Sequence, residues 1–258
     1  LLVNERMDVV IDMEPIRSAD VRVDAGEPDV KGHEGELTAA KRLVPRLRET
    51  YGGWLDVLVV DALYGNGPFL SVAKQVGFGV IAVIKKKTDE PLKEALAIWS
   101  DSPPSRSHDN PHTHEHTQLW DCPDIGTLES YEGLIRVVRG VVRPADGETT
   151  RTWCFAVTGS ATRLTARQIL AAGRGRWHEE NTAFHQFVHL WKFGHVFTHG
   201  PEALPTLFWF FFLAFNLLQL FLYRHLKSYG RDRGNDPTRT ISRLVDEMQD
   251  DLARLDCF

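Results

Sequence analysis

The chain has 258 residues, of which 43% are hydrophobic and 25% are charged, and its formal net charge at neutral pH is −5. These values are those of an ordinary globular protein with enough apolar side chains for a core, and they exclude a disordered or fibrous chain. The charge is uneven, because residues 1–36 contain ten acids and four bases whereas residues 131–176 contain eight arginines and three acids. The second segment could contact phosphates, although a solvated face would have the same composition.

The first hundred residues alternate between strand-like and helix-like patterns. Short apolar, β-branched runs predict strands, and apolar residues at three- and four-residue spacing predict amphipathic helices. The polar and acidic residues 18–33 predict a loop. Strands are expected at residues 1–3, 9–11, 55–60 and 80–84, and helices at residues 34–51 and 68–76.

The rest of the chain has strand-like runs before its helices. Residues 100–117 are rich in Ser, Pro, His and Asn, which predicts an exposed loop. Three runs then predict a small antiparallel insertion, at residues 118–120, 134–142 and 152–157. Helices are expected from Thr165, from Arg176 to about Lys192 and from Thr206 to Leu226, with Gly173 to Gly175 weakening or interrupting the first. A charged tail begins at Lys227 and contains a short amphipathic stretch, Ile241 to Leu255.

Asp61 ends an apolar, β-branched run and is followed within a few residues by a Gly-Asn-Gly-Pro turn. This pattern predicts a buried strand that delivers a carboxylate to the rim of a sheet, where α/β proteins bind ligands and metals. A carboxylate is a hard ligand suited to Mg²⁺ or Mn²⁺. A strand-end Asp also serves as a helix cap or turn former, so both interpretations are open at this point.

A second acid lies far downstream among arginines. Arg176 and Glu180 are four residues apart and share one face of a predicted helix, whereas Glu179 points elsewhere. The two could form only a surface ion pair. Alternatively, the arginine could hold a DNA phosphate while the glutamate holds a metal. A strand-end Asp and a helical Glu beside an Arg meet the needs of metal-dependent phosphodiester chemistry.

The histidines form two groups that could suggest zinc. The first lies in the predicted loop with Asp109 and Glu115 and consists of His108, His112, His114 and His116. Its spacing matches no closed four-ligand pattern, so we interpret it as a polar loop. The second group, His185 and His189, lacks the glutamate of a zinc-protease helix. We interpret these two as partly buried or DNA-facing helix residues.

Residues 207–223 are almost entirely apolar and nearly long enough to span a bilayer. Arg224 and Lys227 could anchor such a span on its cytoplasmic side. Asn216 and Gln219 lie in the middle of the run, however, and the tract is slightly short of a typical span. A buried core helix is therefore preferred over a membrane span.

Three segments carry a resemblance to a known family: residues 36–43, 60–64 and 175–181, the last continued by Phe184 and residues 195–200. They resemble, in that order, the helix before the second acidic strand, the strand with the second catalytic Asp, and the helix with the catalytic Glu of bacterial insertion-sequence transposases. These enzymes are of the DDE type and have a ribonuclease H-like core. The likeness covers most of residues 1–226, and the combination of Asp-x-Leu-Tyr with Arg-Trp-x-x-Glu-Asn is fairly specific.

The resemblance implies an α/β fold in which a ribonuclease H-like mixed sheet is flanked by helices, with a small antiparallel β insertion before the helix that carries the catalytic Glu. It divides the chain into an amino-terminal core part without its first strand, a β-rich insertion, the carboxyl-terminal core helices and a charged tail. Their bounds are residues 1–99, 100–160, 161–226 and 227–258.

The resemblance also implies that Asp61 and Glu180 are catalytic and bind Mg²⁺ or Mn²⁺. DNA contacts are implied for five further residues and for Arg176, which would hold a phosphate near the cleaved bond; the five are Arg174, Asn181, Lys85, Lys86 and Lys87. A solvated loop is the alternative for the lysines. The implied reaction is cleavage and strand transfer at insertion-sequence ends. Double-stranded DNA is the implied partner, as transposon ends and as target, and a homodimer is a further candidate.

The chain departs from the family at several positions. No residue matches the first catalytic Asp, since Asp12 ends a strand but the order of elements makes it a poor match. Gly173 stands where related enzymes often have Tyr, and Lys192 is the nearest base to a position where they often have Lys. We therefore expect an incomplete transposase region with weak or no cleavage. The alternative is a catalytically inactive DNA-binding remnant.

The expected location is the prokaryotic cytoplasm, in association with the nucleoid and without membrane contact. The three cysteines (Cys122, Cys154 and Cys257) are scattered without a CxxC pair, which favours a reducing compartment. The amino end has no signal-peptide pattern. The chain starts at Leu1 rather than at a methionine, which fits either a fragment or an alternative start codon.

Overall fold

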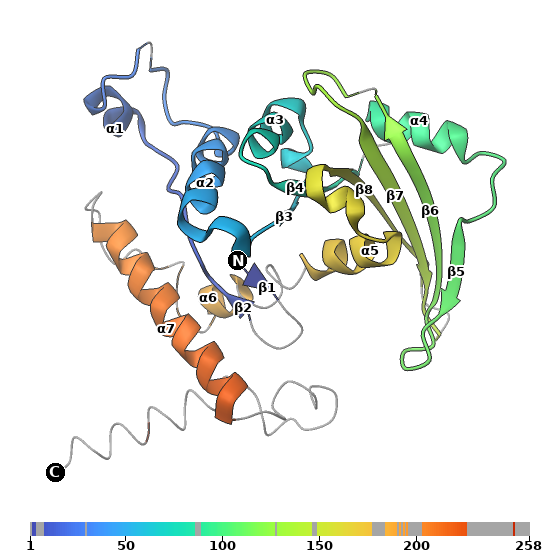
Figure 1. The fold of residues 1–258 in the computed structure, drawn as a ribbon. Coiled ribbons are helices and arrows are strands. Elements are labelled where there is room, and N and C mark those ends of the chain that lie inside the picture. Colours follow the sequence, from blue (N-terminus) through green and yellow to red (C-terminus); the bar gives the residue numbers. More distant parts are fainter. Residues whose placement is uncertain are drawn as a thin grey trace. The chain divides into compact units, whose positions relative to one another are not determined.

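The structure, a computed structural model, describes residues 2–3, 8–28, 30–85, 89–126, 128–145, 149–176, 184–189, 191, 193, 195, 203–225 and 250. The chain divides into two compact units. The larger unit is Asp12–Trp177, and the smaller unit combines Leu1–Ile11 with His178–Phe258. The larger unit holds a six-stranded sheet, and the smaller unit holds a two-stranded hairpin and two helices among its described residues (Figure 1).

The sheet of the larger unit is mixed, with the strand order β3-β4-β8-β7-β6-β5. Its strands are β3 (Val57–Val60), β4 (Gly79–Val83), β5 (Arg106–Asp109), β6 (His116–Ile125), β7 (Ile135–Arg143) and β8 (Arg151–Thr158). Only β3 and β4 are parallel; the other neighbours are antiparallel. The prediction of an α/β protein with a mixed sheet flanked by helices is confirmed.

The strands expected in an insertion continue the sheet of the preceding segment. The second half of β8 pairs with β4, with Val83 opposite Phe155 and Val80 opposite Thr158. The strands on either side of residue 100 therefore share one hydrogen-bonded sheet. β4 is buried from Gly79 to Ala82, as expected for a strand with neighbours on both sides.

Helices cover both faces of this sheet. Neighbouring side chains of a strand point to opposite faces, so Val137 and Val138 of β7 enter different cores. Val137 packs with residues of α4 (Glu90–Ile98), whereas Val138 packs with residues of α5 (Ala166–Gly175). α4 was not predicted from the sequence. The prediction of an exposed loop over residues 100–117 is wrong in part, because β5 forms there.

The remaining helices of the larger unit precede the sheet or connect its first strands. α2 (Glu36–Tyr51) confirms the expected amphipathic helix and ends at Gly52, whose φ of 52° favours glycine. α3 (Gly67–Gln75) joins β3 to β4. The prediction of a loop over residues 18–33 is wrong in part, because α1 (Ala19–Asp24) forms there, capped by the Ser18 side chain.

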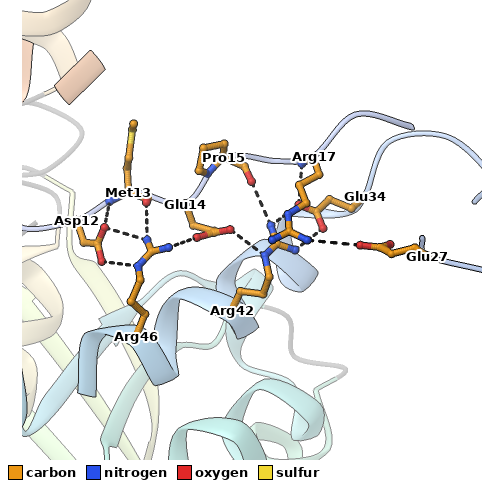
Figure 2. Close-up of polar contacts among 9 residues, drawn as sticks. All are labelled: Asp12, Met13, Glu14, Pro15, Arg17, Glu27, Glu34, Arg42 and Arg46. Atoms are coloured by element: carbon orange, nitrogen blue, oxygen red, sulfur yellow. Dashed lines mark hydrogen bonds and ion pairs between the residues drawn. The ribbon is translucent and has the colours of Figure 1, made fainter. Parts of the chain in front are cut away.

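Ion pairs fasten the acidic segment before α2 to that helix (Figure 2). Arg42 and Arg46 are four residues apart and lie on one face of α2. Arg42 binds Glu34 at 2.5 Å and Glu14 at 2.8 Å. Arg46 binds Asp12 through two hydrogen bonds of 2.9 Å and also contacts Glu14. We call these five residues the α2 ion cluster.

The acids of the α2 ion cluster are largely buried, and Glu34 has a side chain that is only 2% exposed. The Arg42 guanidinium is the main cause that lowers the pKa of Glu34; burial opposes it, and the Arg17 backbone N–H helps. Much of the acidity of residues 1–36 is therefore neutralised within the fold rather than presented to solvent.

α5 lies unusually close to the sheet at two glycines. A Cβ atom on Gly173 would come within 2.2 Å of the Phe155 ring, and one on Gly140 of β7 would lie 2.7 Å from Leu170. Such distances are far inside van der Waals contact. Gly173 therefore lies within α5 and serves close packing, and the helix ends at Gly175, within the stretch that was expected to weaken or interrupt it.

The smaller unit joins the two ends of the chain. β1 (Leu2–Val3) and β2 (Asp8–Val9) lie at or next to the two expected strands and pair antiparallel, and α6 (His185–His189) and α7 (Ala203–His225) are the described helices of this unit. Phe187 and Phe215 are buried together. The Asn216 amide accepts a hydrogen bond from the Val10 N–H at 2.8 Å and donates one to the Val10 carbonyl at 2.7 Å.

α7 is only partly the buried core helix that was expected. By length and composition alone it could cross a membrane, but only 17% of its most apolar window is buried. Phe215, Leu218 and Gln219 are buried, whereas Phe210 and Leu217 are exposed by more than half. Asn216 and Gln219 are the two polar residues of this apolar run. The presence of Asn216 is explained by its hydrogen bonds to the backbone of Val10.

Gly173→Ala should destabilise the protein, because the new methyl group must displace the Phe155 ring. Overpacking of this kind costs about 1–3 kcal/mol, more than the 0.5–1 kcal/mol or so that alanine gains over glycine in a helix. Gly175→Ala is the matched control, since nothing lies within 4 Å of its Cβ position. Urea unfolding should show a loss for the first variant and none for the second; equal stabilities would contradict the close packing.

Glu34→Gln should lower stability at pH 7 by about 1.5–3 kcal/mol, the usual loss when a hydrogen bond to a charged group is removed. The pKa of Glu34 is lowered in the folded state, so its contribution is present above the unfolded pKa and is lost as pH falls through the folded pKa. Urea unfolding of both proteins between pH 7 and pH 3 should show the difference shrinking. Glu49→Gln, at an exposed position of α2, should show little difference at any pH.

Candidate active site

Asp61 lies where the sequence predicted, directly after β3. Its backbone caps the short 3-10 helix Ala62–Tyr64, and the Asn66 side chain then caps α3 by accepting a hydrogen bond from the Phe69 N–H at 3.0 Å. These turns end the strand and send the chain away from the sheet. The Asp61 carboxylate is therefore held at the carboxyl end of β3, with 38% of its side chain exposed.

Two cationic side chains converge on Asp61 from other parts of the larger unit. Lys85 follows β4, the parallel neighbour of β3, and its Nζ lies 3.2 Å from Asp61 Oδ1. Arg176 follows the last residue of α5, and its Nη2 lies 3.9 Å from the same oxygen. The Arg176 side chain is only 7% exposed. The fold thus joins two segments that are more than a hundred residues apart in the sequence.

These neighbours keep the Asp61 carboxylate ionised. Partial burial tends to raise its pKa, but the Ala62 backbone N–H, Lys85 and Arg176 outweigh burial and lower the pKa below its usual value. Oδ1 itself is shielded from solvent and accepts no hydrogen bond of regular geometry. At neutral pH the site therefore presents an anionic oxygen that only ion pairs satisfy.

Two of the segments that resemble the transposase family are in direct contact. The Tyr64 hydroxyl, from the Asp-Ala-Leu-Tyr run, donates a hydrogen bond to the Glu36 carboxylate at the start of α2. Tyr64 also packs against Phe69, with ring centroids 5.1 Å apart. This contact fixes the turn after Asp61 against a separate helix.

The other predicted site residues have different positions. Arg174 does not join Asp61; it pairs with Glu115 of the β5–β6 hairpin at 3.3 Å and lies over the Trp153 ring. This contact was missed, because nothing in the local sequence links the three residues. Four predicted residues lie outside those that the structure describes: Glu180, Asn181, Lys86 and Lys87.

The described residues contain no group of three or more His, Cys, Asp or Glu side chains that could hold a metal. Asp12, the poor candidate for the first catalytic Asp, is engaged by Arg46 in the α2 ion cluster. In the histidine group, His116 pairs with Asp109 across the β5–β6 hairpin, with 2.6 Å between Nδ1 and Oδ1. Two metal ligands were predicted, Asp61 and Glu180, and of these two the structure describes the surroundings of Asp61.

A separate hollow of about 680 Å³ lies on the sheet away from Asp61, lined in part by Asp121, Arg136 and Thr162. Its arginine is already satisfied, because it binds Asp121 through two nitrogens and the carbonyls of Thr162 and Leu164 through the third. The hollow therefore offers no free cation for an anionic ligand, and the surroundings of Asp61 remain the stronger candidate site.

No protein-family model matches the chain, and no curated protein matches it at a significant level. The resemblance to the DDE transposases is therefore carried by the quoted segments alone.

Lys85→Met should raise the pKa of Asp61, because it removes one of the positive charges that favour the carboxylate. Carboxyl-detected NMR titration of the purified protein would measure the change. Lys93→Met is the control, since that lysine pairs with Glu90 on α4. An Asp61 pKa that is the same in both variants would contradict the assigned contact.

Proposed function

We propose that this chain is the catalytic region of a DDE-type DNA transposase with a ribonuclease H-like core, and that it acts on double-stranded DNA through a divalent metal. The observation that carries this proposal is the meeting of Asp61, at the end of β3, with Arg176, just after α5. The sequence pattern and the resemblance both pointed to metal binding by the acid and phosphate binding by the arginine.

The electrostatics of the site are suited to that division of roles. The Asp61 carboxylate is ionised, and carboxylate oxygens are the ligands that a hard cation prefers; a metal at the shielded Oδ1 would displace Lys85 and Arg176 from it. Arg176 and Lys85 present positive charge beside it, where a phosphate of the DNA backbone could bind. Before a metal or a phosphate binds, these two cations balance the charge of Asp61.

Asp61 would hold the metal together with Glu180, which lies four residues beyond Arg176 in the sequence. When bound, Mg²⁺ or Mn²⁺ would activate a water or a DNA 3′-hydroxyl and stabilise the leaving oxygen. The task of this chain's own residues is to place the two carboxylates and to hold the scissile phosphate. Arg176 is held in position, with 7% of its side chain exposed, and it would have to become accessible for a DNA phosphate to reach its guanidinium.

β3 lies at the edge of the described sheet, so a further strand could pair with it and add an acid to the site. Its four residues are all apolar, as in an interior parallel strand, yet each is only half-buried and β3 stands at the edge of the described sheet. A further strand paired with β3 could end in an acid beside Asp61. In the proposed enzyme, the first acidic strand of the family would occupy that edge.

The second candidate function is a DNA-binding remnant without catalytic activity. It is favoured by the engagement of Asp12 with Arg46 and by the lack, among the described residues, of a group of three or more side chains that could hold a metal. Such a chain would keep the fold and the basic side chains but would bind a metal weakly. It could compete with intact transposases for the same DNA ends.

Mn²⁺ binding and DNA cleavage, measured on the same preparations, separate the two candidates. In a version with the complete acidic triad, Asp61→Ala or Glu180→Ala should abolish cleavage, a loss of at least 10²-fold, and Asp61→Ala should weaken Mn²⁺ binding. Asp56→Asn, an exposed residue before β3, is the control and should change neither. Wild-type cleavage in the Asp61 variant would refute the site. DNA binding without any effect of Asp61 on Mn²⁺ affinity would favour the remnant.

A further inference from the structure

Lys85 and Arg176 reach Asp61 from very different surroundings. The Lys85 side chain is 57% exposed, whereas that of Arg176 is 7% exposed. Lys85 Nζ lies 3.2 Å from Asp61 Oδ1, and Arg176 Nη2 lies 3.9 Å from the same oxygen. Lys85 is therefore the closer partner of the carboxylate and also the cation that a dissolved anion can reach.

The backbone fixes where Lys85 begins and leaves its side chain free to move. β3 and β4 are parallel, so both strands bring the residues that follow them to one edge of the sheet. The Ile84 N–H donates a hydrogen bond to the Cys154 carbonyl of β8 at 2.8 Å, which anchors the chain directly before Lys85. A lysine side chain is a flexible four-carbon stem that ends in a compact charge. Lys85 can therefore exchange the Asp61 carboxylate for another anion without any movement of the strand.

The Asp61 carboxylate occupies Lys85 in the structure. Among the described residues, Asp61 is the acid with which Lys85 forms an ion pair. A phosphate that approaches Lys85 has to displace this carboxylate and is repelled by its charge. Ion pairs between partly exposed groups are weak, so the competition lowers the affinity for phosphate without abolishing it.

We propose that Asp61 masks Lys85 in the metal-free protein, and that Lys85 binds a phosphate of the DNA backbone once the charge of Asp61 is neutralised. This inference rests on the proposed function, since it assigns the phosphate contact within the same site. Unlike Arg176, Lys85 needs no change in burial to make that contact. A divalent cation at Asp61 would neutralise the carboxylate, so phosphate binding at Lys85 would follow metal binding. Arg176 then serves to position the carboxylate.

Masking makes a different prediction from an ordinary basic surface. If Lys85 simply added positive charge to a DNA-binding face, its removal would weaken DNA binding in the metal-free protein. If Asp61 masks it, removal of Lys85 has little effect until Asp61 is neutral. A double-mutant cycle on the two residues separates these cases, because the coupling between them is the quantity that the cycle measures.

The test measures binding of the full chain to a fluorescein-labelled DNA duplex by anisotropy in EDTA. Asp61→Asn should raise the affinity about tenfold at about 50 mM salt and about threefold at about 200 mM, because one added phosphate contact steepens the salt dependence by about 0.9. Lys85→Met should change little by itself and should remove the gain when combined with Asp61→Asn. Asp56→Asn is the control, since it makes the same change in net charge at an exposed residue before β3 and should give little gain.

An equal gain in Asp56→Asn, or a gain that survives Lys85→Met, would overturn the proposal. If urea unfolding shows that Asp61→Asn does not fold, Mn²⁺ replaces the mutation: it should raise the affinity of the wild type for the duplex but not that of Lys85→Met. Equal responses of the two proteins to Mn²⁺ would also overturn the proposal.

These results are separate from the fate of the proposed function. An Asp61→Asn protein with unchanged DNA affinity and weakened Mn²⁺ binding would overturn the masking of Lys85 alone. The absence of any duplex binding at low salt, in the wild type and in every variant, would overturn both.

Discussion

The close approach of α5 to the sheet is the constraint on which the candidate site depends. Gly173 lets the helix lie against the Phe155 ring, and Gly140 makes room for Leu170 from the other side of the same contact. Because α5 ends two residues after Gly173, this packing decides where Arg176 emerges, and Arg176 emerges beside Asp61. A bulkier residue at position 173 would push the helix outward and carry the arginine with it. A tyrosine at position 173 would therefore be incompatible with this packing.

The acids of the α2 ion cluster and Asp61 are neutralised by cations in different ways. In the α2 ion cluster, Asp12, Glu14 and Glu34 are each matched by a guanidinium, so the acids hold an otherwise irregular segment onto a helix. Asp61 is also balanced by cations, but at looser distances and with a partly exposed side chain. The first arrangement is closed and structural. At Asp61, by contrast, a divalent cation could replace Lys85 and Arg176 as partner of the carboxylate, as a metal-binding role would require.

Local patterns predicted most of the regular structure, and the misses have physical reasons. The strand before Asp61 and the helix α2 follow from apolar periodicity, which burial on one or two faces imposes directly. β5 was missed because a short edge strand with the sequence Arg-Ser-His-Asp is exposed and carries no apolar alternation. The packing role of Gly173 was missed because glycine weakens an isolated helix, and only tertiary packing shows that its missing side chain is required here. Arg174 and Arg176 have the same local pattern, so their separate partners, Glu115 and Asp61, depend on the fold alone.

The pairing of Asn216 with Val10 has a consequence for the order of events during synthesis. The two residues are 206 positions apart, so at about 5–20 residues per second the ribosome reaches Asn216 roughly 10–40 s after Val10. All of Asp12–Trp177 is translated in that interval. The sheet can therefore assemble before the hairpin of β1 and β2 has its helical partner, so this hairpin is among the last of the described elements to reach its final surroundings.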